Sequence, residues 1–434
     1  MPSQALPGFR DFYPEDFAFR THIFDTWRRV ATRYGFEEYD GPPLEALDLY
    51  TRKSGAEIVS QLYNFRDKGD REVALRPEMT PTLARMVAAR ANGLRKPIRW
   101  FSIAQMFRYE RHQRGRLREH FQVNCDVFGE AGPMADAEVI ALLIDIARGF
   151  GLGPGDVRLR ISDRRVLTAL LRGAGVGEDQ TDLAFTALDK YERLDRKAIE
   201  GLLEGSAGAG LNPGTIAKVL EIPRLQGLEQ VGDALAAGPG GAGALAPLRA
   251  TVDALTAMGL GDYVDVDLTI VRGLAYYTGT VFELFDASRS LRAIAGGGRY
   301  DDLLGLLGGT NLAAVGFAMG DVVLGELLKD RKLVPASTSR LDVFVAAVTE
   351  SDLPDVLRLV HQCREAGLRT EFALTPQAVG KQLKLADARN ARFAVVIGPD
   401  DRARNEVQIK DLVAKAQHAV GRSEAVASLL TALA

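Results

Sequence analysis

The sequence predicts an α+β protein in three parts: a mainly antiparallel sheet with flanking helices, a helical insertion, and a C-terminal α/β domain. Three observations support this prediction. Residues 98–130 read as two apolar-rich strands joined by a short basic loop, the pattern of an antiparallel pair. Residues 163–260 are rich in alanine and leucine and look helical. From Leu341 onward, strand and helix patterns alternate, which is typical of a small domain with a mostly parallel sheet.

Length and composition limit what the chain does. With 434 residues, of which 47% are hydrophobic and 26% charged, it is long enough for two or three globular domains. A net charge of −3 argues against wholesale coating of nucleic acid, but it leaves room for a local basic surface. No apolar run reaches the length of a membrane span, and the N-terminus lacks the pattern of a signal peptide. The two cysteines imply no disulfide framework, so we expect a cytoplasmic protein without membrane association.

The first 90 residues predict two helices and two strands. In residues 17–35, apolar side chains recur at helical spacing, and a short strand ended by two prolines follows. Residues 72–90 predict a strand that turns at a proline and opens a second helix near Thr80. The Thr80 hydroxyl would cap that helix, which accounts for this residue structurally. Glu78 has no comparable structural role beyond favouring a helix N-terminus.

The predicted hairpin at residues 98–130 is the densest group of polar residues with a candidate function. Six arginines and two acidic residues lie between positions 99 and 120. Strand pairing can place Arg108 and Glu110 beside the polar face of the second strand. That polar face consists of Gln122, Asn124 and Asp126. The arrangement suits a ligand with an ammonium group and phosphates, and the alternative is a solvated hairpin with an incidental basic loop.

Strand patterns return after the insertion and are followed by glycine-rich segments and a closing helix. The C-terminal domain has equal numbers of basic and acidic residues, so it is no bulk electrostatic binder. We therefore expect four segments: 1–162 and 261–332 for the two parts of the sheet domain, 163–260 for the helical insertion, and 340–434 for the α/β domain.

Three separated blocks resemble the histidyl-tRNA synthetase family. They are FRYERHQRGRLREHFQ, VRGLAYYTGTVFE and AIAGGGRYDDL, in the order of the family. The C-terminal segments AGLRTEFAL, GKQLKLADARNARFAVVIG and EVQIKDL resemble its anticodon-binding domain. The resemblance implies a catalytic domain of the class II aminoacyl-tRNA synthetase type, with a six- to seven-stranded, mainly antiparallel sheet. It also implies that the C-terminal α/β domain binds the anticodon.

The resemblance further implies an activity and partners. The expected reaction joins L-histidine to ATP as a histidyl-adenylate, and then transfers the histidyl group to tRNA(His). Mg²⁺ is expected to accompany ATP, although the spacing of the five histidines indicates no metal site in the protein. The first-motif helix implies a homodimer. The alternatives are a non-catalytic, synthetase-like regulatory paralogue of histidine biosynthesis and a tRNA-binding module without aminoacylation.

By this resemblance, particular residues take particular roles. Arg108 and Arg272 are the expected catalytic residues, which grip the reacting carboxylate and α-phosphate from opposite sides. Arginine suits this role because its planar fork bridges two oxyanions. The residues expected to bind histidine are Glu78, Thr80, Arg108, Gln122, Asp126, Arg272, Tyr276 and Tyr277. Those expected to bind ATP are Arg108, Glu110, Arg116 and Arg272, and the alternative for Arg116 is a contact with the tRNA acceptor end.

The chain departs from the family pattern in three places. Asp126 stands where many members have glutamate, and position 275 is alanine where many have aspartate. In the third motif, Asp321 and Val322 replace a glutamate–arginine pair whose arginine normally sandwiches adenine. The adenine and γ-phosphate contacts must therefore be rearranged, and we hypothesise that Arg116 or Arg118 takes over part of that role.

Overall fold

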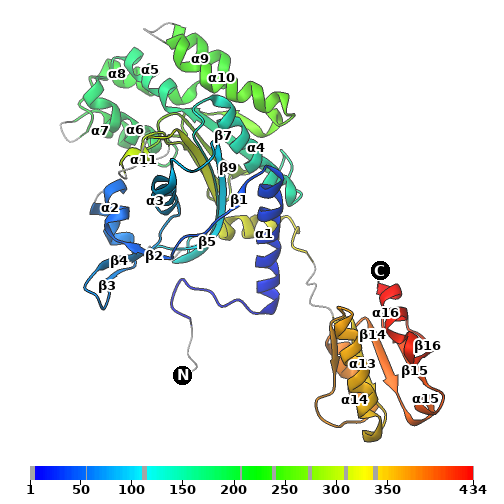
Figure 1. Ribbon diagram of the computed structural model, residues 1–434. Helices are drawn as coiled ribbons and strands as arrows, with labels where there is room; N and C mark the ends of the chain where they lie inside the picture. The colour runs from blue at the N-terminus through cyan, green and yellow to red at the C-terminus, as the bar shows by residue number, and fades with distance from the viewer. Residues whose placement is uncertain are drawn as a thin grey trace. The chain divides into compact units, whose positions relative to one another are not determined.

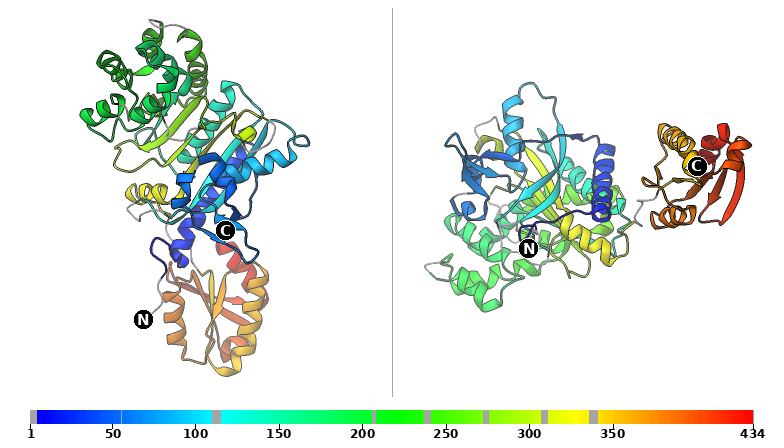
Figure 2. Two further views of the ribbon diagram at one scale, coloured as in Figure 1. Left: turned by 90° about the vertical axis from the view of Figure 1, so that its left-hand side faces the viewer. Right: turned by 90° about the horizontal axis from the view of Figure 1, so that it is seen from below.

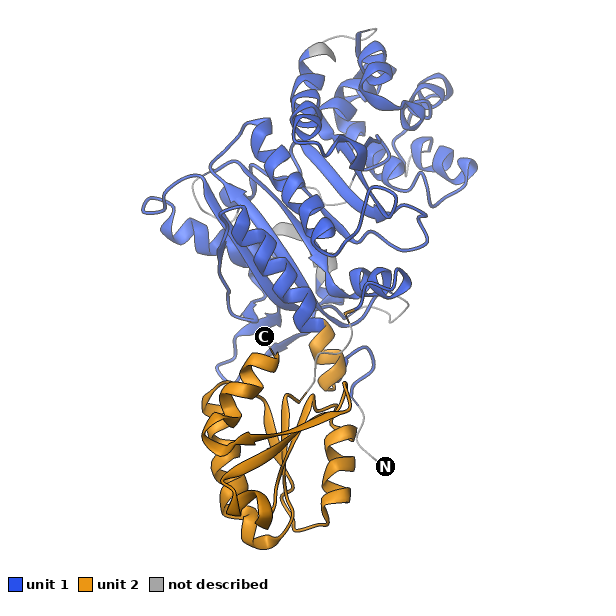
Figure 3. Cartoon of the chain, turned by 90° about the vertical axis from the view of Figure 1, so that its right-hand side faces the viewer, with its two compact units in different colours: residues 1–11, 20–334 blue, residues 12–19, 335–434 orange. Residues whose placement is uncertain are grey.

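The computed structural model describes residues 5–54, 56–109, 115–205, 208–236, 241–271, 276–306, 311–335 and 341–433. It divides into two compact units, which Figure 3 colours separately. Residues 1–11 and 20–334 make up unit 1, and residues 12–19 and 335–434 make up unit 2. The helices between residues 164 and 257 fall within unit 1, so the independence of the helical insertion stays a prediction.

Unit 1 is built on a sheet that has eight strands in the described part of the chain. The six inner strands pair antiparallel, and the two short edge strands pair parallel with their neighbours. The predicted α+β class is therefore confirmed, with eight strands in place of six or seven. In sheet order the strands are β1 (Glu37–Glu38), β5 (Ile98–Phe107), β6 (Glu119–Phe128), β11 (Ala314–Gly320), β10 (Ala295–Arg299), β9 (Thr280–Asp286), β7 (Val157–Asp163) and β8 (Val264–Val266).

The predicted hairpin forms β5 and β6, which pair with Ala104 opposite Gln122. Its polar face is not solvated. The exposed fractions are 9% for Gln122, 3% for Asn124 and 2% for Asp126. Burying such groups is costly unless they find partners, so the interpretation of a solvated hairpin is wrong.

Helices cover both faces of the sheet, and Figure 1 shows α1 (Pro14–Arg33) and α4 (Pro133–Gly149) on one face and α3 (Thr80–Arg90) on the other. The apolar stripe of α1 buries Trp27, and Phe24 of the same helix contacts the ring of Phe121 on β6 at 5.1 Å. Because side chains alternate along a strand, the neighbours of Phe121 face the side of α3. The polar residues of β6 therefore share their face of the sheet with α3.

Helix α3 begins at Thr80 itself. A residue that caps a helix lies just before the first helical residue, so Thr80 does not occupy the capping position. Met79 is the N-cap residue, and no side chain caps the helix. The predicted cap is therefore wrong, and Pro81 falls in the first turn, where its missing N–H costs nothing. The hydroxyl of Thr80, a residue expected to bind histidine, is not used to cap the helix.

Arg299 at the end of β10 ties the sheet to the beginning of α4. Its guanidinium forms an ion pair with Asp136 at 3.0 Å, and both side chains are 1% exposed. The same guanidinium donates hydrogen bonds to the carbonyl oxygens of Glu130 and Gly132, at 3.0 and 3.1 Å. Arg299 is a structural residue in this arrangement.

The remaining elements of unit 1 surround this sheet. A small antiparallel sheet contains β2 (Leu44–Ala46), β4 (Glu72–Leu75) and β3 (Asn64–Arg66). Figure 2 shows the helices of residues 164–257, in green, gathered at the end of the large sheet where β7 and β8 lie. The further helices are α2 (Asp48–Ser54), α5 (Arg164–Ala174), α6 (Thr181–Asp189), α7 (Arg196–Leu203), α8 (Pro213–Val219), α9 (Gly227–Ala236), α10 (Gly241–Ala257), α11 (Leu303–Leu306) and α12 (Asp321–Asp330).

Unit 2 contains a five-stranded sheet with helices, as predicted for an α/β domain. The sheet is mixed, however, with two parallel and two antiparallel pairings, so the expectation of a mostly parallel sheet is wrong. No described helix of the chain is both long and apolar enough to cross a membrane. The elements are β12 (Val343–Ala347), α13 (Leu353–Glu365), β13 (Thr370–Phe372), α14 (Val379–Ala388), β14 (Phe393–Ile397), α15 (Pro399–Ala403), β15 (Glu406–Asp411), β16 (Ala416–Gly421) and α16 (Ala425–Leu433).

Candidate active site

The register of the sheet places a polar row across its centre, on the face of α3. Asn124 of β6 lies opposite Ala318 of β11, which lies opposite Gly296 of β10. Gly296 in turn lies opposite Glu283 of β9, and Glu283 lies opposite Arg160 of β7. Residues in register stand side by side, so small side chains occupy the middle of the row and polar ones its two ends. The middle of the sheet is hollow on this face.

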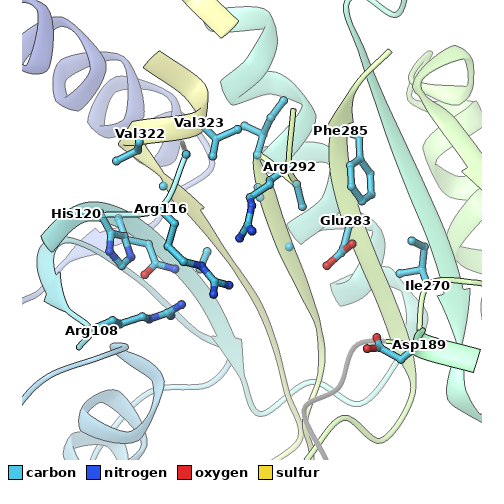
Figure 4. Close-up of a pocket in the computed structure, with 18 of the residues that line it drawn as sticks. Arg108, Arg116, His120, Asp189, Ile270, Glu283, Phe285, Arg292, Val322 and Val323 are labelled. Atoms are coloured by element: carbon cyan, nitrogen blue, oxygen red, sulfur yellow. The ribbon is translucent and has the colours of Figure 1, made fainter. Parts of the chain in front are cut away.

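A cavity of about 760 Å³ lies over this hollow. Figure 4 shows Arg108, Arg116 and Arg292 pointing into it, with Val322 and Val323 on one wall and Glu283 on the floor. Three arginine side chains that point into one space favour an anionic ligand. The other polar or charged lining residues are His120, Gln122, Asp189, Glu192, Arg193 and Thr269.

Arg108 is held at the mouth of the hairpin by two contacts. Its backbone N–H donates to the carbonyl oxygen of Arg118 at 2.9 Å, which extends the pairing of β5 and β6. Its side-chain Nε–H donates to the carbonyl oxygen of Pro77 at 3.0 Å, in the turn that leads to Glu78. The remaining N–H groups of the guanidinium are thereby oriented toward the cavity before any ligand binds.

Asp126 lies in a buried polar cluster beside the cavity. Its carboxylate accepts a hydrogen bond from the hydroxyl of Tyr300, and the Tyr300 ring contacts Tyr276 at 5.9 Å. Burial, with the Asp126 carboxylate beside it, raises the pKa of Tyr300 well above its usual value, so the hydroxyl stays a donor. A Cβ on Gly316 would come within 2.0 Å of Asp126 Oδ1, so only glycine leaves space for this carboxylate.

The structure brings some of the predicted site residues together and separates others. Arg108, Arg116 and Gln122 line the cavity, whereas Arg272 and Glu110 lie outside the described residues. The following predicted residues are described but do not line the cavity: Glu78, Thr80, Asp126, Tyr276 and Tyr277. The two tyrosine rings lie 4.7 Å apart, directly before β9. Their roles stay predictions.

The structure adds residues that the sequence did not indicate as a site. Tyr300, Glu283 and Arg292 are examples, and only the three-dimensional register connects them. Asn124 belongs to the predicted polar face but has no predicted role, and its Oδ1 is buried without a hydrogen-bond partner among the described residues. The sequence did carry a signal for Asn124, since it alternates with Gln122 on the polar face of β6.

His120 is a further addition, and its charge state follows from its surroundings. Burial, reinforced by the nearby charge of Arg108, lowers the pKa of His120 to about 3, against the opposing effect of a hydrogen bond with Gln122. The imidazole is therefore neutral at physiological pH. A neutral ring adds no further positive charge to the cavity.

This shift predicts a pH dependence of stability. Below pH 6.5 the unfolded chain protonates His120 and the folded protein does not, so stability falls as the pH drops toward 3. The loss reaches about 2 kcal/mol at pH 5. The variant His120→Phe cannot take up this proton. Its thermal midpoint, measured by calorimetry, should fall less between pH 7.5 and pH 5 than that of the wild type, and an equal fall would contradict the buried neutral imidazole.

In the altered third motif, Asp321 has a structural role. The carboxylate of Asp321 accepts hydrogen bonds from the Phe121 backbone N–H and from Arg10, both at 2.9 Å, and so connects the start of α12 to β6. Asp321 is turned away from the cavity, and Val322 lines it. Arg118 does not line the cavity, since its guanidinium lies over the Tyr109 ring at 4.6 Å. Of the two arginines in our hypothesis, the structure favours Arg116.

Comparison with known proteins identifies the family. The model of the family described as histidyl-tRNA synthetase matches residues 8–321, and that of an anticodon-binding domain matches residues 342–431. A histidine–tRNA ligase of Opitutus terrae is 46% identical over 428 residues, which cover 97% of this chain and 96% of the relative. The chain belongs to the histidyl-tRNA synthetase family. The resemblance inferred from the sequence blocks is thereby confirmed.

Solved structures of the histidyl-tRNA synthetase family share the fold. The enzyme from Nostoc sp. PCC 7120 superimposes with a TM-score of 0.82 at 26% identity, over 99% of both chains. A Bacillus halodurans protein described as an ATP phosphoribosyltransferase regulatory subunit/histidyl-tRNA synthetase has a TM-score of 0.75 at 22% identity, over 92% of this chain and 98% of its own. At that identity the likeness concerns the fold alone, so the fold does not separate the enzyme from the regulatory paralogue.

Proposed function

We propose that this protein is a histidine–tRNA ligase, which joins L-histidine to tRNA(His) through a histidyl-adenylate at the expense of ATP. The observation that carries the proposal is the cavity in which Arg108 is fixed over a floor of small residues. Its cations suit the phosphates of ATP, and the buried amide and carboxylate groups beside it suit an ammonium group. Membership of the histidyl-tRNA synthetase family supports the same activity.

The first step brings two anions together. A carboxylate oxygen of histidine attacks the α-phosphorus of ATP, and the bond to the β-phosphate oxygen breaks, so that pyrophosphate leaves. Arg108 lowers the repulsion by donating hydrogen bonds to both the carboxylate and the α-phosphate. By family resemblance Arg272 approaches the α-phosphate from the opposite side. Arg108 is oriented before the reaction and needs no large movement during it.

The histidine substrate is held by its ammonium group and its imidazole. Glu78, Gln122 and Asp126, with Thr80 nearby, supply acceptors for the ammonium hydrogens. Asp126 is shorter than the glutamate of many relatives, and its bond with Tyr300 fixes the position of its carboxylate. Tyr276 and Tyr277 bind the imidazole. A pocket that pairs both imidazole nitrogens discriminates strongly against apolar amino acids, because a wrong ligand leaves buried polar groups unpaired.

ATP enters with Mg²⁺ in this proposal. Arg116 faces the terminal phosphates, and Glu110 faces the adenine. In the described part of the chain, no cluster of three or more His, Cys, Asp or Glu side chains suits a metal ion. Mg²⁺ commonly binds through one or two carboxylates together with substrate phosphates, and Glu283 at the floor of the cavity fits that use. The ion would neutralise charge on the phosphates.

The partners of the protein are also part of the proposal. Residues 342–431 match an anticodon-binding model, which supports binding of tRNA(His) by unit 2. A homodimer is proposed from the resemblance of the first helix to the dimer-forming first motif. We place the reaction in the cytoplasm, where the two buried cysteines would stay reduced.

A decisive test is histidine-dependent ATP–pyrophosphate exchange by the purified protein, followed by aminoacylation of tRNA(His). We expect both activities. The regulatory paralogue predicts binding of histidine without exchange, and a tRNA-binding module predicts binding of tRNA without either reaction. The match of residues 342–431 to an anticodon-binding model supports the enzyme.

A further inference from the structure

Arg292 lines the cavity, and none of the roles described above includes it. It lies between β9 and β10, and Figure 4 shows its guanidinium pointing into the cavity below Val323. Among the described residues, no ion pair or hydrogen bond engages this side chain. By contrast, the exposed Arg289 on the same turn forms an ion pair with Glu192 at 3.1 Å. Arg292 therefore presents to the cavity a positive charge that no described residue pairs directly.

The backbone on both sides of Arg292 is held in place. The carboxylate of Asp286, at the end of β9, accepts the backbone N–H groups of Ser290 and Leu291 at 3.0 and 2.9 Å. On the other side, the backbone N–H of Ile294 donates to the carbonyl oxygen of Leu284 at 2.8 Å. The turn is thus rigid, and the Arg292 side chain starts from a fixed position at the rim of the cavity.

Arg292 lies next to the hairpin loop that carries Arg116. A Cβ on Gly115 would be 3.9 Å from Cδ of Arg292 and 3.7 Å from a methyl group of Val323. Figure 4 shows the guanidinium groups of Arg116 and Arg292 directed toward the same part of the cavity. Two cations directed at one space repel each other unless an anion lies between them. The neighbouring Val322 contributes no charge, so the cationic end of the cavity depends on these two arginines.

We propose that Arg292, together with Arg116, binds the β- and γ-phosphates of ATP. The inference rests on the proposed function, because it concerns the same reaction. As the carboxylate oxygen bonds to the α-phosphorus and the α–β bridging oxygen departs, negative charge accumulates on pyrophosphate. Arg292 donates hydrogen bonds to that leaving group. Arg292 thereby supplies, from the turn between β9 and β10, a phosphate contact that Val322 cannot make.

Calorimetric titration of the full-length protein tests the inference. The ligands are MgATP, Mg-pyrophosphate, and a non-hydrolysable histidyl-adenylate analogue that has the base and ribose but no β- or γ-phosphate. For Arg292→Ala, the dissociation constants of MgATP and pyrophosphate should each rise about tenfold, and that of the analogue should change less than twofold. Arg292→Lys should recover part of the loss, and Arg292→Gln should not. The exposed Arg95, which does not line the cavity, offers a matched control as Arg95→Ala.

Each outcome decides between alternatives. If Arg292→Ala weakens the analogue as much as ATP, Arg292 contacts the base, and the phosphate assignment is overturned. Unchanged binding of all three ligands, or an equal loss in Arg95→Ala, overturns it as well. Absence of exchange activity in the wild type would overturn the proposed function instead, because the titrations depend on binding and not on turnover.

Discussion

Replacing Arg108 with alanine is expected to lower the rate of histidine-dependent ATP–pyrophosphate exchange by about 10³-fold. Its guanidinium is oriented by the Pro77 carbonyl oxygen and points into the cavity, where the proposed reaction brings carboxylate and α-phosphate together. The lost hydrogen bonds are strongest in the transition state, where charge is concentrated, so kcat should fall much more than the affinity for histidine. Single-turnover formation of the adenylate measures this step directly.

Two controls make the Arg108 result specific. Arg108→Lys retains the charge but not the planar fork, and it should recover only a small part of the rate. The thermal midpoint of Arg108→Ala should stay close to that of the wild type, because one side-chain hydrogen bond to a carbonyl is a small part of the total stability. A rate within tenfold of the wild type would remove Arg108 from the catalytic residues.

Replacing Arg299 with alanine is expected to destabilise unit 1 by about 3–5 kcal/mol. The substitution leaves the carboxylate of Asp136 buried without its cation, and it frees the carbonyl oxygens of Glu130 and Gly132. The midpoint of thermal unfolding, measured by calorimetry, should drop accordingly. The double variant Arg299→Ala/Asp136→Ala should be more stable than Arg299→Ala alone, since it no longer buries an unpaired charge.

A surface ion pair provides the comparison for Arg299. Arg28 and Glu38 lie 2.7 Å apart, with side chains that are 45% and 40% exposed. Solvent screens such a pair, so Arg28→Ala should cost no more than about 1 kcal/mol. Equal losses of stability in Arg28→Ala and Arg299→Ala would contradict the structural role assigned to the buried pair.

Local patterns were enough to predict most of the fold. The stripe around Trp27 and the alternation from Phe121 to Val127 are signals within one element, and each element forms with the face that the pattern indicates. The missed strands carry no such pattern. Strands β2 and β3 have three residues each, and β16 is largely exposed and lacks an apolar face. Without β16, the sheet of unit 2 looked mostly parallel.

The candidate site was predictable where its residues share one hairpin. Arg108 and Gln122 carry the right chemistry on one face of two paired strands, and the structure places both at the cavity. Glu283 and Arg292 joined the site only through the pairing of β6, β11, β10 and β9. That pairing connects residues far apart in the sequence, and no local pattern specifies it. The hydrogen bond between Tyr300 and Asp126 is hidden in the sequence for the same reason.

The valine wall of the cavity has a consequence for inhibitor selectivity. Val322 and Val323 line the cavity, and by family resemblance the usual third motif has an arginine at position 322. A compound that competes with ATP and directs a branched hydrocarbon group at this wall would gain from burial against the two valines. In relatives that keep the arginine, the same group would have to displace or desolvate a guanidinium, which is costly. We expect such a compound to distinguish this synthetase from those relatives.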